Sequence, residues 1–178
     1  MDIENAGQST LTVERPRLAD IAPIFNLIQN CSRQGVMNGA YLVPRFQAGL
    51  ALQLLMVYFF GRIRLSDGAW FATRLYIGRR EGRFSGFALA RQFKEPGTGF
   101  EIYLFAIAPD ERRRGHGRLL LQAVLDDLGA GNRVQASCLP GAIAMERLLC
   151  SLKFQPLPKQ SRSERCDYAR KPGLRLVA

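Results

Sequence analysis

The sequence contains few of the residues that build metal centres. It has a single histidine, His116, and four cysteines in 178 residues. Cys31, Cys138, Cys150 and Cys166 are too far apart for the Cys-x-x-Cys spacing that is typical of zinc sites. The sequence therefore predicts no metal site, and we expect the four cysteines to be free thiols.

Long hydrophobic runs and a secretory leader are also missing. The most apolar stretch, residues 48–60, is interrupted by Gln53 and is shorter than the ~20 residues that a membrane-spanning helix needs. The opening residues MDIENAGQST are polar and acidic, unlike a signal peptide. We therefore expect a cytoplasmic protein. The apolar stretch should lie in the core or in a homodimer interface; docking on a membrane surface, helped by Arg62 and Arg64, is the alternative.

Acidic residues are scarce relative to basic ones. There are 15 Asp and Glu against 25 Lys and Arg, which gives a formal net charge of +10. Such a protein attracts anions, whether nucleic acid, a phosphorylated cofactor or an acidic protein. Apolar residues make up 47% of the chain, which is enough for a folded core.

Hydrophobic periodicity and turn residues divide the chain into alternating strands and helices. Asp20 is a candidate cap for the first helix, and Pro44 opens the second. Expected strands cover 9–16, 70–80, 84–93, 100–108, 133–140 and a region from 154; expected helices cover 19–30, 44–60, 117–128 and 142–152. This order predicts an α/β (α+β) fold, a mixed sheet with helices on both faces, in one domain over 1–178. The basic C-terminal segment from about 161 is expected to be loosely held.

One short stretch, PDERRRGHGRLLL at 109–121, stands where a central strand gives way to a helix. The first backbone N–H groups of a helix lack partners, so an anion binds well there. Gly115 and Gly117 allow close approach of that backbone, and the arginines supply forked donors for phosphate oxygens. A dinucleotide fingerprint would need glycine at Leu120, and the Gly-Lys-Ser/Thr of a P-loop is missing. The stretch therefore predicts a different pyrophosphate site, with a solvated turn as the alternative.

In its context this stretch resembles the acyl-CoA signature of the GNAT N-acetyltransferase superfamily, Arg/Gln-x-x-Gly-x-Gly/Ala. The order of elements is also similar, from about Leu11 to Phe154. The resemblance implies a central, mostly antiparallel sheet, acetyl-CoA as co-substrate and no metal. It also implies the cofactor-binding residues: Phe105 and Ile107, whose backbone would pair with the pantetheine arm, and the turn Arg112, Arg113, Arg114, Gly115, His116, Gly117 and Arg118. His116 holds a variable motif position, so we expect a surface residue there.

Glu101 is the candidate catalytic base, because amine acylation requires the attacking amine to lose a proton. By strand alternation Glu101, Tyr103, Phe105 and Ile107 should share one face. The stretch EIYLFAIAPDERRRGHG is most similar to the histone-acetyltransferase branch of the superfamily, and in that branch a glutamate at the matching position is the general base. A solvated surface glutamate is the alternative.

The general acid is not apparent in the sequence. Many family members carry a tyrosine at the position of Leu149, and a glycine at that of Lys153. Tyr103 is one substitute, Cys150 and Ser151 lie near the expected position, and the CoA thiolate could also leave unprotonated.

The sequence thus predicts an acyl-CoA-dependent N-acyltransferase that acts on a primary amine: a protein lysine, an N-terminus or a small molecule. Two alternatives remain. The basic charge suits an RNA-directed member that acetylates charged tRNA, and Leu149 suits a non-catalytic module that binds CoA or a partner. The loops expected to choose the acceptor carry no signature.

Overall fold

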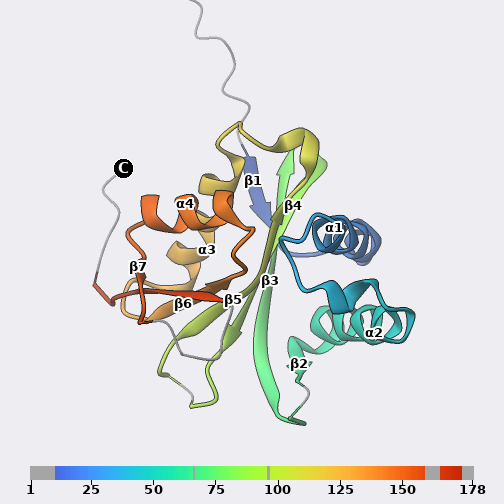
Figure 1. The fold of residues 1–178 in the computed structure, drawn as a ribbon, viewed down its shortest axis with the longest axis horizontal. Coiled ribbons are helices and arrows are strands. Elements are labelled where there is room, and N and C mark those ends of the chain that lie inside the picture. The colour runs from blue at the N-terminus through green and yellow to red at the C-terminus, as the bar shows by residue number, and fades with distance from the viewer. Residues whose placement is uncertain (1–10, 66, 96, 159–164, 174–178) are drawn as a thin grey trace, which may run out of the picture.

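The computed structural model describes residues 11–65, 67–95, 97–158 and 165–173, and these form a twisted sheet with two helices on each face (Figure 1). Its strands are β1 (Leu11–Glu14), β2 (Arg62–Arg64), β3 (Trp70–Arg80), β4 (Arg83–Gln92), β5 (Phe100–Ile107), β6 (Val134–Cys138), β7 (Gln155–Pro156) and β8 (Cys166–Arg170). The helices are α1 (Ile21–Arg33), α2 (Pro44–Phe60), α3 (His116–Leu128) and α4 (Ile143–Ser151), with short 3-10 turns η1 (Leu18–Asp20), η2 (Gly39–Leu42) and η3 (Pro109–Glu111).

The strand order is β1-β3-β4-β5-β6-β8-β7, with β2 added beside β3. Every pairing between these strands is antiparallel except that of β5 with β6. The predicted mixed, mostly antiparallel sheet with helices on both faces is therefore confirmed.

Each face of the sheet has its own hydrophobic core. On one face α1 and α2 bury residues such as Ile24, Ile28 and Leu54 against Ile77 and Phe87. On the other face α3 and α4 bury side chains against β4, β5 and β6; among them are Leu121, Val124, Leu125, Leu128, Leu149 and Leu152. The apolar stripes expected at helical spacing in the sequence are the ones that fill these cores.

Helix α2 is apolar all round, and only one of its sides is buried. Pro44 stands at its start, and Gly61 ends it in the left-handed conformation with φ +61°. Leu50 and Leu54 pack inward, whereas Leu52 and Phe59 are 62% and 61% exposed. Core burial thus accounts for the inner side alone. None of the helices in the described part of the chain is both long and apolar enough to cross a membrane.

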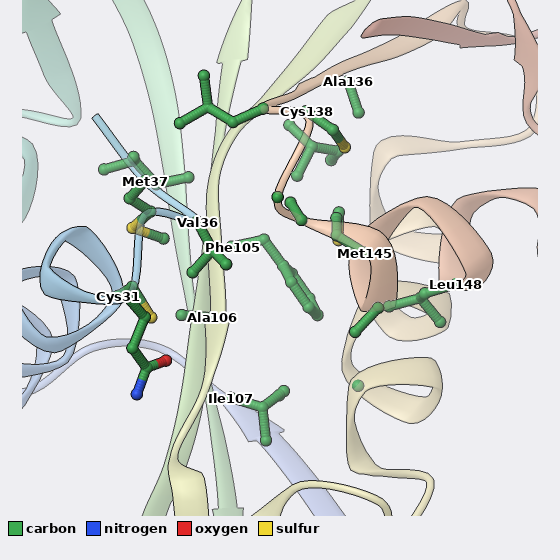
Figure 2. Close-up of a pocket in the computed structure, with 18 of the residues that line it drawn as sticks. Cys31, Val36, Met37, Phe105, Ala106, Ile107, Ala136, Cys138, Met145 and Leu148 are labelled. Atoms are coloured by element: carbon green, nitrogen blue, oxygen red, sulfur yellow. The ribbon is translucent and has the colours of Figure 1, made fainter. Parts of the chain in front are cut away.

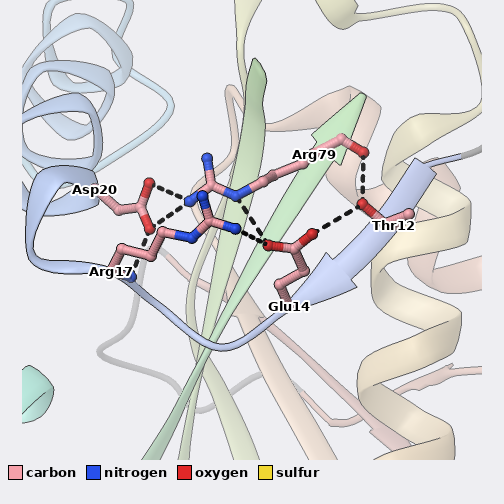
Figure 3. Close-up of polar contacts among 5 residues, drawn as sticks. All are labelled: Thr12, Glu14, Arg17, Asp20 and Arg79. Atoms are coloured by element: carbon pink, nitrogen blue, oxygen red, sulfur yellow. Dashed lines mark hydrogen bonds and ion pairs between the residues drawn. The ribbon is translucent and has the colours of Figure 1, made fainter. Parts of the chain in front are cut away.

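A buried ion pair joins the start of α1 to the sheet (Figure 3). The guanidinium of Arg79 donates to both carboxylate oxygens of Asp20 at 2.7 Å, and its Nε donates to Glu14 at 3.2 Å. Asp20 also accepts from the backbone N–H of Arg17 at 2.7 Å. The expectation that Asp20 caps α1 is therefore wrong: its oxygens serve Arg79 and the preceding η1 turn, and they make no cap hydrogen bond to α1.

The C-terminal segment contains a strand that the sequence did not predict. Cys166–Arg170 forms β8, which pairs with the whole of β6 and buries Tyr168. The expectation of a loosely held segment from about 161 is wrong for these residues, because the open edge of β6 supplies them with backbone partners. Residues 161–164 and 174–178 lie outside the described part of the chain.

Candidate active site

Strand β5 carries a one-residue bulge that changes which face each side chain takes. Leu89 of β4 pairs with Leu104, but the next residue, Ala90, pairs with Ile102, so Tyr103 is extra. A bulge of this kind interrupts the alternation of the strand. Tyr103 and Leu104 both pack on the α1–α2 face, and Phe105 and Ile107 pack on the α3–α4 face.

The expectation that Glu101, Tyr103, Phe105 and Ile107 share one face is therefore wrong. Glu101 and Tyr103 precede the shift and lie toward α1 and α2. The two cofactor-arm candidates, Phe105 and Ile107, follow it and lie toward α3 and α4. The extra residue places the proposed base and the proposed cofactor contacts on opposite faces.

Beyond the bulge β5 and β6 separate. They pair only over Phe100–Ile102 and Val134–Ala136, although β5 continues to Ile107. The separation opens a cleft of about 640 Å³ between the two faces of the molecule (Figure 2). One edge of β5 is thereby left without a strand partner, which suits an extended ligand that pairs with backbone.

The cleft has two walls. The acceptor wall, as we call it, consists of residues from the α1–α2 connection and the bulge: Val36, Met37, Asn38, Tyr41, Tyr103 and Leu104. The cofactor wall consists of Phe105 and Ile107, of Ala142, Met145 and Leu148 in the α4 region, and of five residues of the turn 112–118: Arg112, Arg113, Gly115, Gly117 and Arg118. Figure 2 shows Val36 and Met37 on one side of β5 and Met145 and Leu148 on the other.

The turn 112–118, called the glycine turn below, presents unpaired backbone to the cleft. Arg113 and Gly115 both adopt left-handed conformations, with φ +62° and +82°. Gly115 accepts from the N–H groups of Arg118 and Leu119, whereas no backbone or side-chain acceptor within the described chain bonds those of 113–117. Alternating left- and right-handed residues ahead of a helix form a concave anion site.

Gly117 lies where the turn meets both the strand and α4. A Cβ added there would stand 3.5 Å from Ile107 and 3.5 Å from Leu148, so a methyl group fits and a branched side chain does not. The backbone at Gly117 therefore lies close to the apolar side chains that line the cleft between β5 and α4.

The arginines of the glycine turn differ in what they contact. Arg112 donates through Nε to the carbonyl of Ile107 at 3.0 Å and through a second nitrogen to Gln34 at 3.2 Å, so it ties the turn to β5 and α1. Its third nitrogen lies 3.7 Å from Cys31 Sγ. Arg113 and Arg118 line the cleft. Arg114 is not among the lining residues that the structure describes.

His116 is not the surface residue that the sequence suggested. It is 3% exposed, and its Nδ1 lies 2.8 Å from Glu111 Oε2. Arg80 of β3 approaches the same carboxylate at 3.7 Å. The prediction is wrong because the partner comes from the η3 turn five residues earlier, which folds back over the helix start. The buried His116 therefore connects the first residue of α3 to the η3 turn.

Glu101 is held by a neighbouring arginine. Arg91 Nε donates to Glu101 Oε2 at 2.6 Å, and both side chains are mostly buried, at 20% and 16% exposure. The same guanidinium stacks 5.1 Å from the centre of the Tyr103 ring and 4.9 Å from that of Phe71. Glu101 is not among the described residues that line the cleft. Arg91 thus contacts both Glu101 and Tyr103, and Tyr103 lines the cleft.

Two tyrosines face each other on the acceptor wall. Burial, followed by the neighbouring Tyr103 hydroxyl, raises the pKa of Tyr41, while Arg165 acts in the opposite direction. Sequence reasoning considered Tyr103 but missed Tyr41, which lies in a stretch expected to be loop and is brought in by η2. Leu149, at the usual tyrosine position, is fully buried in the core. Cys150 and Ser151 are exposed and do not line the cleft.

The comparisons with known proteins agree with this geometry. A family model described as Acetyltransferase (GNAT) family matches residues 49–149, more than half of the sequence and the whole of the glycine turn. The chain belongs to the GNAT acetyltransferase family. It is therefore an acetyl-CoA-dependent acetyltransferase that acts on an amine. A search of curated proteins gives no significant match.

Solved structures share the fold of this acetyltransferase at low sequence identity. The structure of yncA from Salmonella typhimurium with its cofactor acetyl-CoA has a TM-score of 0.67 at 18% identity, covering 96% of this chain and 98% of that one. The paia N-acetyltransferase of Thermoplasma acidophilum, in complex with coenzyme A, has a TM-score of 0.67 at 8% identity, covering 91% and 99%. A histone acetyltransferase HPA2 and related acetyltransferase from Corynebacterium glutamicum gives 0.65 at 16%, covering 94% and 99%.

The residues present fit coenzyme A. The unpaired amides of the glycine turn suit its pyrophosphate, the close approach at Gly117 leaves room for its chain, and the open edge of β5 offers partners to its amides. Among the described residues, no cluster of three or more His, Cys, Asp or Glu that could hold a metal ion occurs.

Proposed function

We propose that this acetyltransferase moves the acetyl group directly from acetyl-CoA to a primary amine that enters along the acceptor wall. The observation that carries the proposal is the separation of β5 from β6 beyond Ile102. It leaves one continuous cleft with the glycine turn on one wall and Tyr41 and Tyr103 on the other. A thioester lying along β5 from the glycine turn would present its carbonyl near the bulge, where both walls meet.

Glu101 is the proposed base and Tyr103 the proposed acid. The ammonium group loses a proton to Glu101 by way of a water, and the neutral amine attacks the acetyl carbonyl. The nitrogen of the resulting tetrahedral intermediate loses its second proton to solvent, the C–S bond breaks, and the thiolate takes a proton from Tyr103 or from solvent. Support comes from the shared face of the two side chains and from Arg91, which contacts both.

The cysteines of the cleft favour direct transfer over an acetyl-enzyme intermediate. Burial raises the pKa of the Cys31 thiol, with Arg112 opposing the shift. Burial, followed by Glu146, raises the pKa of Cys138 to about 12. Because the thiolate is the nucleophilic form of cysteine, both groups are poor acyl acceptors at neutral pH.

The test is release of the CoA thiol from acetyl-CoA in the presence of a broad amine panel, with the acetylated product identified by mass. Amine-dependent thiol release with 1:1 product supports the proposal. Release without any acetylated amine would contradict it. The RNA-directed alternative is distinguished by charged tRNA as acceptor, with binding that weakens steeply as salt rises.

The assembly of the protein is also a proposal. We infer that residues 1–178 act as one acetyltransferase domain and that the outer side of α2 forms a homodimer interface. Exposed Leu52, Phe59 and Phe60 support this, because contiguous exposed apolar side chains commonly mark a partner. The four free thiols suit the reducing cytoplasm, which is where we place the protein.

A further inference from the structure

An arginine and a glutamate face each other across β4 and β5, next to the bulge. Arg91 of β4 is the register partner of Glu101 of β5, and the extra residue Tyr103 follows two positions later on β5. The two side chains are only 20% and 16% exposed. Separating an ion pair that is shielded from water leaves an uncompensated charge, so such a pair is held firmly in one geometry.

The contacts within this pair fall on a single carboxylate oxygen. Arg91 Nε donates to Glu101 Oε2 at 2.6 Å, and a second nitrogen of the guanidinium lies 2.5 Å from the same oxygen. Among the described residues, no side chain or backbone group donates a hydrogen bond to Oε1. Both oxygens of a carboxylate accept hydrogen bonds. Arg91 therefore occupies one oxygen of Glu101 and leaves the other to water.

Two aromatic rings hold the guanidinium of Arg91 in place. Its centre lies 4.9 Å from the centre of the Phe71 ring and 5.1 Å from that of the Tyr103 ring. A flat guanidinium stacks on ring faces, which an ammonium group does less well. Phe71 belongs to β3, whereas Tyr103 is the bulged residue and lines the cleft. One arginine thus connects three strands and joins Glu101 to the cleft wall.

The other elements around the pair bring no second buried counter-charge within the described chain. Gln135 of β6, which pairs with Glu101, is uncharged, and Thr73 of β3 pairs with Arg91. Tyr103 and Tyr41 are the ionisable groups on the nearby acceptor wall. The charged residues of the helices, strands and loops packed around the pair are all exposed: Arg33 of α1, Arg45 of α2, Arg62 and Arg64 of β2, Lys94 and Glu95 of the β4–β5 loop, and Arg133 before β6.

We propose that Arg91 is a positioning residue for acetyl transfer: it holds Glu101 by Oε2 and thereby presents Oε1 to receive the proton of the amine. The inference rests on the proposed function and deepens it. One N–H bond of the ammonium breaks, the proton passes through a water to Oε1, and Glu101 becomes a neutral carboxylic acid. Arg91 keeps its own proton throughout, because a guanidinium does not ionise in this range. Glu101 returns the proton to solvent after turnover.

Arg91→Met tests the proposal, because it keeps an apolar stem and removes the guanidinium. We expect turnover to fall by roughly 10- to 100-fold, since a displacement of about 1 Å in the catalytic geometry is enough for such a loss. The acidic limb of the pH–rate profile should move to higher pH, because a carboxylate without its counter-charge takes up a proton more readily. Acetyl-CoA affinity should not change, since the pair lies on the α1–α2 face of the sheet.

The same substitution in a Glu101→Gln background separates positioning from a structural role. If Arg91 acts through Glu101, Arg91→Met adds no further loss of turnover to Glu101→Gln. This double variant also removes both charges together, so it serves where Arg91→Met alone does not fold. Arg91→Lys keeps the charge but loses the two-nitrogen contact and the ring stacking. It should leave the acidic limb in place and lower turnover by less than Arg91→Met.

Arg74→Met is the matched control, because Arg74 makes the same two kinds of contact on the α3–α4 face. It pairs with Asp127 at 2.9 Å and lies 5.3 Å from the centre of the Phe100 ring. This variant should keep the turnover and the pH profile of the wild type.

Three results would overturn the inference and leave the proposed function intact. They are an Arg91→Met enzyme with an unmoved acidic limb, an equal loss of turnover from Arg91→Met in both backgrounds, and wild-type turnover in Arg91→Lys. Failure of the proposed function is seen without any Arg91 variant. An acidic limb that survives Glu101→Gln would remove the base, and failure of every amine to accept acetyl would remove the transfer itself.

Discussion

The two walls of the cleft are built in different ways. The cofactor wall depends on backbone: positive φ at Gly115, unpaired amides, and the space that Gly117 leaves beside Ile107 and Leu148. The acceptor wall depends on side chains from segments far apart in the chain, such as Met37, Tyr41 and Tyr103. Backbone recognition needs glycine at fixed spacing and therefore leaves a motif. Side-chain recognition can be assembled from almost any positions, so it leaves none.

If the two walls are functionally separate, the largest effect should come from the acceptor side. Glu101→Gln keeps the shape of the side chain but cannot accept the proton of the amine. We expect turnover to fall by roughly 10²–10⁴ and the acidic limb of the pH–rate profile to disappear, with little change in acetyl-CoA affinity. Steady-state kinetics across pH, together with calorimetry, measures both.

Glu95→Gln, in the exposed β4–β5 loop, is the control for this substitution. Glu101 also pairs with Arg91, so a purely structural role is the competing account. In that case the apparent Michaelis constant for the acceptor would rise and the pH profile would keep its acidic limb. That pattern would contradict the role of Glu101 as general base. It would not affect the proposal that the cofactor wall binds acetyl-CoA.

The converse change acts on the cofactor wall. Gly117→Val places branched methyl groups in the space that a Cβ alone would fill, next to Ile107 and Leu148. Acetyl-CoA binding should weaken by at least about 1–3 kcal/mol, measured by calorimetry. Gly131→Val, at a turn where nothing lies within 4 Å of the added Cβ, should bind normally. Unchanged affinity in Gly117→Val would mean that the phosphates bind elsewhere.

A surface outside both walls provides a third comparison. Leu52→Glu puts a carboxylate on the outer side of α2, where the native leucine is 62% exposed in the monomer. Burying that unpaired charge in a dimer would cost about 1–3 kcal/mol or more, so the dimer should dissociate in light scattering. Acetyl-CoA affinity should not change. A wild-type protein that is monomeric across the accessible concentrations would rule the dimer out.

The smallest effect should come from the far end of α3. Asp127 accepts from Tyr76 at 2.7 Å and from Arg74 at 2.9 Å, and the Tyr76 hydrogen bond is the main cause that lowers its pKa. A carboxylate with a lowered pKa stabilises the fold above its unfolded value near 3.9 and loses that contribution as pH falls through the folded value. Because the side chain is 55% exposed, Asp127→Asn should cost less than ~1 kcal/mol at neutral pH.

Denaturant unfolding at pH 7 and at about pH 3 measures how the effect depends on pH. The loss in free energy of unfolding caused by Asp127→Asn should be smaller at the lower pH. Asp126→Asn is the matched control: Asp126 is exposed, and Gln122 of the same helix donates to it. A deficit that grows as pH falls would contradict the assignment.

Sequence reasoning recovered what depends on local pattern. The periodic stripes of α1, α3 and α4 predicted their buried sides. The glycines predicted the turn before α3, and binding of the cofactor by that turn stays a prediction. Sequence reasoning failed on β5, where one extra residue changes the register of pairing with β4. A tyrosine at position 103 does not by itself predict a bulge. Without a bulge, strand alternation places Glu101 and Ile107 on the same face. The burial of His116 and the strand β8 were missed for a related reason: each depends on a partner, Glu111 or β6, that only the fold supplies.

The gap between β5 and β6 gives the molecule an unpaired strand edge in the middle of a sheet rather than at its border. Exposed edges at the border of a sheet invite pairing with other chains and promote aggregation. Here the unpaired edge of β5 lies inside the cleft, between the connection that follows α1 and the glycine turn. Pairing of β5 with β6 beyond Ile102 would close the cleft and remove the unpaired edge together.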